Sequence, residues 1–209
     1  MAPDTTGASR PADWRAADAP LTPVAGGPAL SWPPELLLRA QGMRIAFFDV
    51  DGVLTDGGLY LSAEGETLKR FHTLDGHGLK LLRQAGIEPC VLSGRDSAPL
   101  RQRLAALGVT RAQLGNEHKL PAAEAWLAEL GLDWSQAAVI GDDWPDLPLL
   151  ARAGFACAPP GAHPEARARA AYVTRAAAGA GAAREFCDLL LVAGGHYRRL
   201  LDAALGAAP

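Results

Sequence analysis

The segment Arg44–Gly57 reads RIAFFDVDGVLTDG, an apolar run that passes directly into Asp49, Asp51 and a glycine. Such a run is typical of a buried parallel strand whose carboxyl end carries polar side chains. In an open parallel sheet, ligands bind in the crevice beyond the carboxyl ends of the strands. The segment therefore predicts the first strand of the fold and one side of a binding site.

From Met43 onward, short apolar runs alternate with longer segments that carry apolar residues at helical spacing. The expected strands are Arg44–Val50, Glu88–Ser93, Ala112–Leu114, Ala137–Ile140 and Phe155–Ala158, with Ala171–Thr174 as a candidate sixth. The expected helices are Gly78–Gln84, Ser97–Leu107, Lys119–Leu130, Asp146–Ala153 and Arg184–Val192. Alternation of this kind implies right-handed crossovers. We therefore predict an α/β fold, a Rossmann-like open parallel sheet flanked by helices.

The interval Leu59–Phe71 breaks this alternation at a place where a crossover helix is expected. It reads as a strand, a turn at residues 63–66 and a second strand, which indicates a β-hairpin. The hairpin is expected to project as a flap directly after the first strand. No insertion of domain size follows it or precedes Lys119, so we expect no large cap domain.

Composition divides the chain of 209 residues into three parts. Seven of the sixteen prolines fall in the first 34 residues, which lack a periodic apolar pattern. We expect residues 1–40 to be a flexible leader, with a short helix at Pro34–Ala40. Residues 41–195 suffice for one α/β domain with a sizeable core. The pair Gly194-Gly195 separates residues 196–209, which we interpret as a tail that acts as a docking arm.

The charge balance argues against nucleic acid or a membrane as a partner. The chain has 20 Lys and Arg against 23 Asp and Glu, a net charge of -3, which leaves no global field for polyanions. No apolar stretch approaches the ~20 residues that span a bilayer, and no signal-peptide core is present. We expect a cytoplasmic protein, with Cys90, Cys157 and Cys187 as reduced core residues.

Polar side chains follow four of the expected strands. The segments concerned are Asp49–Gly57, Ser93–Arg95, Gly115–Lys119 and Gly141–Asp146. Carboxylates gathered at one point raise one another's pKa unless a cation neutralises them, and oxygen ligands without a Cys or His cluster favour Mg2+. Once a phosphate ester bridges to that ion, a free carboxylate faces the phosphorus, while Ser93 and Lys119 can bind the phosphoryl oxygens. This arrangement predicts phosphoryl transfer through a covalent carboxylate intermediate.

These four segments, in this order, resemble the motifs of the haloacid dehalogenase superfamily of aspartate-nucleophile phosphatases. Asp49–Gly57, the hairpin, Phe71–Gly78 and Tyr172–Glu185 further resemble the family of 3-deoxy-D-manno-octulosonate 8-phosphate phosphatases. Members of that family act in lipopolysaccharide biosynthesis. The resemblance covers roughly residues 43–195. Leu74 departs from it, because some members have a basic residue there.

The resemblance implies a role for each acidic residue of these motifs. Asp49 is expected to take the phosphoryl group. Asp51 is expected to protonate the leaving sugar oxygen and then to activate water. The implied Mg2+ ligands are the Asp49 carboxylate, the Asp51 backbone carbonyl and Asp142. Asp143 and Asp146 are expected to orient bound waters and the motif lysine from a second layer.

The resemblance also implies how the substrate is held. Ser93 is expected to bind the phosphoryl oxygens, and Lys119 to neutralise them. The residues implied for the sugar acid lie on the hairpin base and the following helices, and they are Asp51, His72, Thr73, Leu74, Asp75, Gly76, Lys80, Arg95, Arg103 and Lys119. The guanidinium groups of Arg95 and Arg103 suit a carboxylate. Two alternatives stay open: either arginine belongs to a solvated helix face, and His72 packs at the hairpin base without binding substrate.

The resemblance implies a homotetramer in which the hairpin, and by extension the tail, closes a neighbouring site. The expected reaction is Mg2+-dependent hydrolysis of a sugar-acid phosphate, with 3-deoxy-D-manno-octulosonate 8-phosphate as the first candidate substrate. Two alternatives remain open. One is a phosphatase for the 9-phosphate of a nine-carbon, sialic-acid-type sugar, which shares the carboxylate and the terminal phosphate. The other is a relative without catalytic activity that only binds phosphosugars.

Overall fold

Strand β1 (Ile45–Phe48), from the segment that opens the fold, has all of its side chains buried at the centre of a six-stranded sheet. The strand order is β5-β4-β1-β6-β7-β8, and every pair is parallel. The other strands are β4 (Glu88–Leu92), β5 (Arg111–Gln113), β6 (Ala137–Ile140), β7 (Phe155–Ala158) and β8 (Tyr172–Val173). The predicted open parallel sheet is confirmed, and the chain changes direction across it between β1 and β6.

This computed structural model describes residues 30–206. Most of the expected leader, residues 1–29, and the end of the tail, residues 207–209, lie outside the described residues. From Trp32 onward the described chain is one unit. Within residues 30–206, none of the helices combines the length and apolar character that crossing a bilayer demands.

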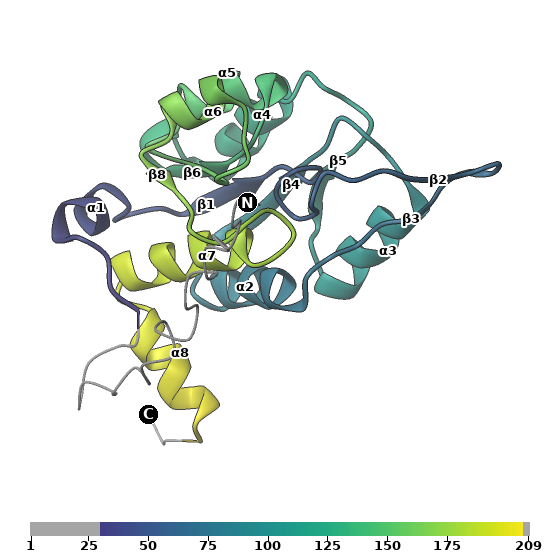
Figure 1. Cartoon of the computed structure of the whole chain (residues 1–209). Coiled ribbons are helices and arrows are strands. Elements are labelled where there is room, and N and C mark those ends of the chain that lie inside the picture. The colour runs from purple at the N-terminus through teal and green to yellow at the C-terminus, as the bar shows by residue number, and fades with distance from the viewer. Residues whose placement is uncertain (1–29, 207–209) are drawn as a thin grey trace, which may run out of the picture. The chain divides into compact units, whose positions relative to one another are not determined.

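Helices cover both faces of the sheet (Figure 1). One face packs against α4 (Leu120–Leu130), α5 (Leu147–Leu150) and α6 (Pro164–Arg169), and the other against α2 (Thr73–Gln84) and α7 (Ala182–Ala193), with α3 (Ala98–Leu107) beside them. Neighbouring β1 side chains take opposite faces, as the strand period requires. Phe47 stacks near Trp126 of α4, and Phe48 meets Phe186 of α7 edge to face. All three cysteines are buried and free, as predicted.

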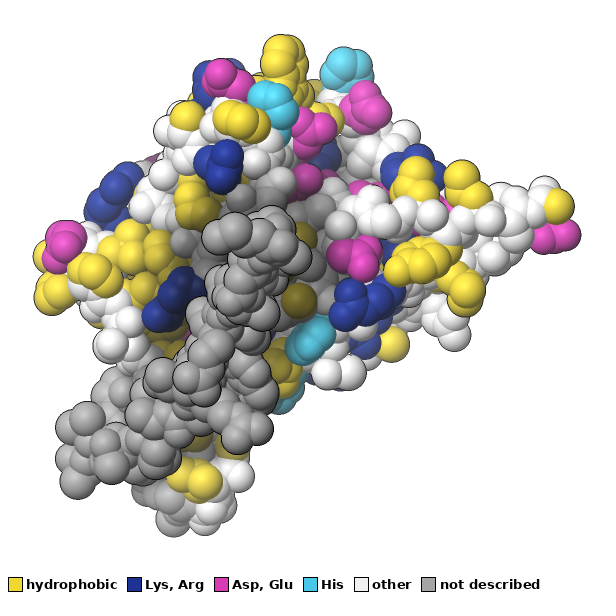
Figure 2. All heavy atoms as spheres, in the orientation of Figure 1, with side chains coloured by type: hydrophobic (Ala, Val, Ile, Leu, Met, Phe, Trp, Pro, Cys, Tyr) yellow, Lys and Arg dark blue, Asp and Glu magenta, His cyan; other side chains and the backbone are white. Residues whose placement is uncertain are grey.

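The predicted flap is the hairpin of β2 (Tyr60–Ser62) and β3 (Gly65–Leu68), which pair antiparallel. Gly65 takes a φ of +99° at the turn, which only glycine adopts without strain. The hairpin extends away from the helices at one side of the sheet (Figure 1). Its large apolar side chains are exposed, and they appear in yellow along the projection in Figure 2. No cap domain follows within the described residues.

Helix α2 begins at Thr73, five residues before the start predicted from periodicity. The imidazole Nδ1 of His72 accepts a hydrogen bond from the Leu74 amide (3.3 Å) and so caps the helix. Glycines in the first two turns hide the apolar pattern. A side chain at Gly76 would meet Arg103 Nη2 at 2.2 Å, and one at Gly78 would meet Cys187 Sγ at 3.0 Å. Both glycines therefore serve close packing against neighbouring helices.

The described part of the expected tail forms α8 (Tyr197–Ala204), a helix that the sequence did not predict, and it packs on α7 of the same chain. Tyr197, Leu200 and Leu201 line a small cavity of about 100 Å³ with residues of α2 and α7. These apolar groups recur at helical spacing, and they face residues of α2 and α7 across this cavity. Helix α1 (Pro34–Arg39) precedes the sheet, and short 3-10 helices lie at Trp134–Gln136 and Trp144–Asp146.

Candidate active site

Three carboxylates meet at the carboxyl ends of β1 and β6. Asp49 directly follows β1, and Asp142 and Asp146 belong to the loop after β6. One oxygen from each carboxylate lies within 4.8 Å of the other two. The Asp49 amide donates to the carbonyl of Ile140 (3.1 Å), so the sheet itself brings the two strand ends together. The cluster occupies the point where strand order reverses, which is where ligands bind in open α/β sheets.

Lys119 is the buried cation of this cluster. Its side chain is 3 % exposed, and its Nζ pairs closely with Asp49 and lies 2.6 Å from Asp146 Oδ1. Burial disfavours the charged amine, but the Asp49 and Asp146 carboxylates more than offset this and hold the pKa of Lys119 above its ordinary value. Lys119 is therefore a fixed positive charge beside Asp49.

One lysine does not neutralise three carboxylates. Burial and the neighbouring Asp146 raise the pKa of Asp49 well above its ordinary value, and they raise the pKa of Asp142 to about 7. The donor atoms are all oxygens, which suits a hard divalent cation. The cluster therefore fits a divalent metal. Asp49 and Asp142 are the carboxylates whose ionised forms a further cation would stabilise most.

Gly52 makes room for this cluster. Its φ is +103°, and a Cβ at this position would lie 2.1 Å from Asp142 Oδ2. Any side chain would thus displace the Asp142 carboxylate or the loop after β1. Gly52 is therefore needed for two reasons: its positive φ, and the close contact between the loops after β1 and β6.

Asp146 supports the cluster through hydrogen bonds that occupy both of its oxygens. Its Oδ1 accepts from Lys119, while Oδ2 accepts from the amides of Asp142 (3.0 Å) and Asp143 (3.3 Å). These contacts orient the lysine and the loop. Asp143 has an exposed side chain, and within the described residues the partners of Lys119 are Asp49 and Asp146, not Asp143.

Ser93 lies at the same edge of the sheet. Phe48 pairs with Val91 in the β1–β4 register, so Ser93 follows β4 nearly level with Asp49. The side chain is 1 % exposed, and its Oγ accepts from the Arg95 amide (3.1 Å). A buried hydroxyl fixed in this way still has a proton to donate toward an anion.

Asp51 has two partners on the hairpin side that the sequence did not single out. Its Oδ1 forms a close ion pair with Lys69 and accepts from Thr55 Oγ1 (3.4 Å). Lys69 Nζ also lies 3.0 Å from Glu66 Oε1, and Glu66 Oε2 lies 3.5 Å from Arg95. The only sequence signal for Lys69 and Glu66 was that their hairpin follows the first strand. Their closeness to Asp51 appears only once the hairpin folds back toward β1.

The residues expected to bind the sugar acid fall into separate groups. Arg103 Nη2 donates to the carbonyl of His72 (3.2 Å) and lies against Gly76, so these three are brought together. Arg95 instead contacts Glu66, as described above. The side chains of Thr73 and Leu74 are exposed at the start of α2. Lys80 is half-buried further along α2 and makes no hydrogen bond or ion pair within residues 30–206.

Asp75 has a structural role in the fold. It is 1 % exposed, and its oxygens accept from the amides of Gly181 (3.3 Å) and Arg184 (2.8 Å) at the start of α7. Burial raises the pKa of this carboxyl despite these hydrogen bonds. It thus connects α2 to the amino end of α7, where backbone amides otherwise lack partners.

Replacing Asp75 by Ala is expected to lower Tm by roughly 2–10 °C, because two buried amides lose their acceptor at about 1–3 kcal/mol. Asp75→Asn keeps one acceptor oxygen and should lose less. Thermal unfolding followed by circular dichroism gives the Tm, and initial rates well below it give KM. A rise in KM with an unchanged Tm would contradict this structural role.

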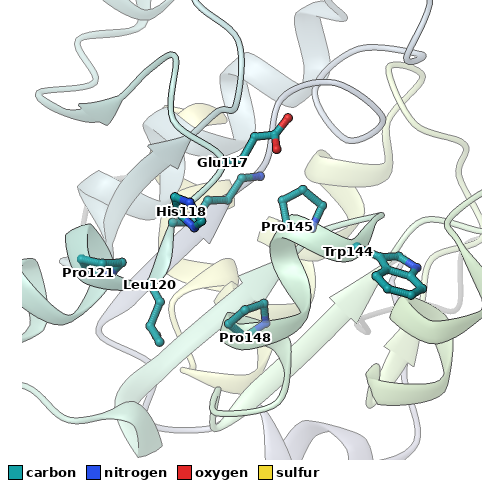
Figure 3. A pocket seen from close by; sticks show the side chains of 8 residues that line it. Glu117, His118, Leu120, Pro121, Trp144, Pro145 and Pro148 are labelled. Carbon is teal, nitrogen blue, oxygen red and sulfur yellow. The ribbon is translucent and has the colours of Figure 1, made fainter.

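An open cavity of about 540 Å³ lies beside Lys119, between the loop before α4 and the loop after β6. Its other lining residues, labelled in Figure 3, are Glu117, His118, Leu120, Pro121, Trp144, Pro145 and Pro148. Trp144 is 63 % exposed, and its Nε1 donates to His163 Nε2 (3.4 Å).

Comparison with known proteins identifies relatives over most of the chain. The family described as haloacid dehalogenase-like hydrolases matches residues 115–186. The 3-deoxy-D-manno-octulosonate 8-phosphate phosphatase KdsC of Escherichia coli K12 is 40 % identical over 172 residues, which cover 82 % of this chain and 89 % of the relative. The enzyme of the same name from Yersinia pestis is 40 % identical over 159 residues, 76 % of this chain and 85 % of the relative.

Solved structures agree with these matches. A probable YrbI family phosphatase from Pseudomonas syringae superposes with a TM-score of 0.80 at 42 % identity, covering 83 % of this chain and 98 % of that one. The 3-deoxy-D-manno-octulosonate 8-phosphate phosphatase of Moraxella catarrhalis superposes with a TM-score of 0.78 at 35 % identity, covering 81 % and 98 %. That structure was solved in complex with magnesium, phosphate and the sugar acid.

Proposed function

Because this chain belongs to the 3-deoxy-D-manno-octulosonate 8-phosphate phosphatase family of haloacid dehalogenase-like hydrolases, we propose that it hydrolyses the phosphate monoester of that sugar acid. The products are 3-deoxy-D-manno-octulosonate and inorganic phosphate. One observation carries the proposal: a buried carboxylate, Asp49, directly beside the fixed cation Lys119 at the ligand-binding edge of the sheet. A carboxylate so placed can attack phosphorus while the lysine stabilises charge on the phosphoryl oxygens.

In the first step, an Asp49 oxygen attacks phosphorus and forms a P–O bond to the protein. The bond from phosphorus to the sugar oxygen breaks, and its electron pair goes to that oxygen, which takes a proton from Asp51. Lys119 and the Ser93 hydroxyl offer donors to the equatorial phosphoryl oxygens. The sugar alcohol leaves, and an aspartyl-phosphate on Asp49 remains.

In the second step, water replaces Asp49 at phosphorus. Asp51 takes a proton from the water as its oxygen attacks, and the bond between phosphorus and Asp49 breaks with its electron pair returning to the carboxylate. Phosphate is released, and both aspartates are back in their starting states. Lys119 keeps its contact with Asp146 throughout, so its charge stays in place.

We propose Mg2+ as the metal of this site, with the Asp49 carboxylate, the Asp51 backbone carbonyl and Asp142 as protein ligands. The all-oxygen donor set and the close approach permitted by Gly52 support this assignment. When bound, Mg2+ would neutralise the carboxylates and the substrate phosphate and polarise the phosphoryl group. Asp143 would orient water from its exposed position next to Asp142.

Mg2+ is expected to stabilise the protein more at about pH 8 than at about pH 5. Without metal, the folded-state pKa of Asp142 is raised from 3.8 to about 7. Between these two pKa values, the folded state holds a proton that the unfolded chain has already lost. The metal-free stability therefore declines as pH rises from 3.8 to about 7. Mg2+ binds the carboxylate form and reverses the decline.

The measurement is Tm by differential scanning fluorimetry with Mg2+ or with EDTA across this pH range. At a Mg2+ concentration of about 100 times Kd, the gain at high pH is roughly 5–10 °C. Asp142→Asn is the control, and it should lose most of the pH-dependent gain. A Mg2+ effect that is independent of pH would contradict the assignment of Asp142.

The substrate assignment is tested by comparing kcat/KM for two sugar-acid phosphates. The eight-carbon 8-phosphate is expected to be preferred over the nine-carbon, sialic-acid-type 9-phosphate. Both carry the carboxylate and the terminal phosphate, so the ratio reports only how the sugar chain fits. A preference of about tenfold or more for the nine-carbon substrate, worth ~1.4 kcal/mol, would reverse the assignment.

We further propose a cytoplasmic homotetramer in which the hairpin of one subunit helps to close a neighbouring site. The exposed apolar side chains Tyr60, Leu61 and Leu68 on the hairpin support an interface there. Light scattering coupled to size-exclusion chromatography measures the assembly. A monomer at micromolar concentration that retains full activity would contradict this part of the proposal.

A further inference from the structure

Lys69 connects the hairpin to Asp51, the proposed proton donor. It follows β3 by one residue, and its side chain is 1 % exposed. Its Nζ pairs closely with Asp51 Oδ1 and lies 3.0 Å from Glu66 Oε1. A buried ammonium is stable only when it is paired, so Lys69 depends on these two carboxylates for its place.

The two carboxylates hold Lys69 in different ways. Glu66 Oε1 is buried and lies 3.0 Å from Lys69 Nζ, yet it has no hydrogen-bond partner within residues 30–206. Glu66 therefore attracts Lys69 by charge, and its other oxygen lies 3.5 Å from Arg95. The directed contact of Lys69 is the hydrogen bond to Asp51.

Asp51 is anchored through one oxygen only. Lys69 and Thr55 Oγ1 both donate to Oδ1, and within residues 30–206 the structure contains no hydrogen bond at Oδ2. A carboxyl group fixed at one oxygen presents the other in a defined direction. Orientation of this kind matters for proton transfer, because the donor must lie within hydrogen-bond reach of the oxygen it protonates.

We propose that Lys69 is a positioning residue that holds Asp51 through Oδ1, so that Oδ2 gives its proton to the leaving sugar oxygen and later takes one from water. The proposal rests on the phosphatase function proposed above. As the bond between phosphorus and the sugar oxygen breaks, the electron pair goes to that oxygen, and the proton from Oδ2 joins it. Lys69 touches no reacting atom.

An alternative role for Lys69 is to anchor the base of the hairpin. The two roles differ in how the loss depends on the leaving group. A misplaced proton donor slows departure of an alkoxide, which needs the proton, far more than departure of p-nitrophenolate, which does not. A disturbed hairpin lowers kcat/KM for both substrates by the same factor.

The experiment measures kcat/KM of wild type, Lys69→Met and Lys69→Arg with the sugar-acid phosphate and with p-nitrophenyl phosphate. kcat/KM reports the steps up to departure of the leaving group. For Lys69→Met we expect a loss of about 100-fold with the sugar phosphate and under about threefold with p-nitrophenyl phosphate, and Lys69→Arg should recover about tenfold. Retained p-nitrophenyl phosphate turnover also shows that the variant is folded.

The matched control is Arg70→Met, the next cation along the chain. Arg70 is 55 % exposed and pairs with Asp56 at 3.1 Å, away from Asp51. Arg70→Met should leave the ratio of kcat/KM for the sugar-acid phosphate to kcat/KM for p-nitrophenyl phosphate unchanged. Equal losses for both substrates in Lys69→Met, or no loss for either, would overturn the inference. Wild-type protein that releases phosphate from neither substrate would instead refute the proposed function.

Discussion

Asn in place of Asp49 is expected to lower kcat for phosphate release by at least about 10⁴-fold. The amide cannot form the P–O bond through which the phosphoryl group leaves the sugar. Of the two carboxylates clustered with Asp49, Asp146 accepts hydrogen bonds at both oxygens, and Asp142 is a proposed metal ligand, so neither is expected to take over this attack. The measurement is phosphate release under saturating Mg2+ and sugar-acid phosphate.

Loss of fold would not explain this result. Burial raises the pKa of Asp49 well above its ordinary value, and Asp49→Asn removes one of three mutually repelling carboxylates, so the metal-free variant should unfold at the same Tm as wild type or a higher one. Asp56→Asn provides the control, since Asp56 lies in the same loop but is exposed and faces Arg70. Undiminished phosphate release by Asp49→Asn would refute the covalent mechanism.

The same variant separates an enzyme from a relative that only binds phosphosugars. In an enzyme, wild type turns over the substrate and Asp49→Asn does not, while both bind it. In a binding protein, neither releases phosphate, and titration calorimetry gives similar Kd values for both. Asp49, Asp51, Ser93, Lys119 and Asp142 are all present, and the first outcome is therefore expected.

The sequence was sufficient to predict the sheet and the acidic cluster because both depend on local patterns. Ala137–Ile140 and Phe155–Ala158 were predicted with the observed bounds, since buried parallel strands are short, continuous apolar runs. Once β1 and β6 are parallel neighbours, the acidic residues that follow them must converge. Lys119 alone would be expected to be solvated, and it was included because it lies with Asp49, Ser93 and Asp142 in the segments that follow the strands.

Features that depend on contacts between distant segments were not predictable in this way. Lys69 and Glu66 lie in a hairpin whose other side chains are mostly exposed, and only the fold shows that these two face Asp51 and Arg95. Asp75 was assigned to the substrate by resemblance, whereas its observed contacts are amides more than a hundred residues away. Helix α8 was missed for a similar reason, because its stability depends on packing against α7.

Replacing Lys119 by Met is expected to have the second large effect, on both stability and activity. Removing one partner of a buried ion pair leaves unpaired charge at a cost of about 3–5 kcal/mol, so the metal-free Tm should fall by roughly 6–20 °C. Three carboxylates then remain without a cation. Activity should fall by about 10²–10³-fold, because the phosphoryl oxygens lose a fixed positive charge.

Mg2+ and a second substitution distinguish these two consequences. Mg2+ should recover part of the Tm of Lys119→Met, because it supplies positive charge to the same carboxylates, but it should not recover activity. Adding Asp146→Asn to Lys119→Met removes one repelling charge and should also recover part of the Tm, again without activity. Arg169→Met, which breaks an exposed pair with Glu165, is the control and should change stability by about 1 kcal/mol or less. If Lys119→Met unfolds at the wild-type Tm without metal, Lys119 does not offset the repulsion among the three carboxylates. Its charge would then serve only to bind substrate.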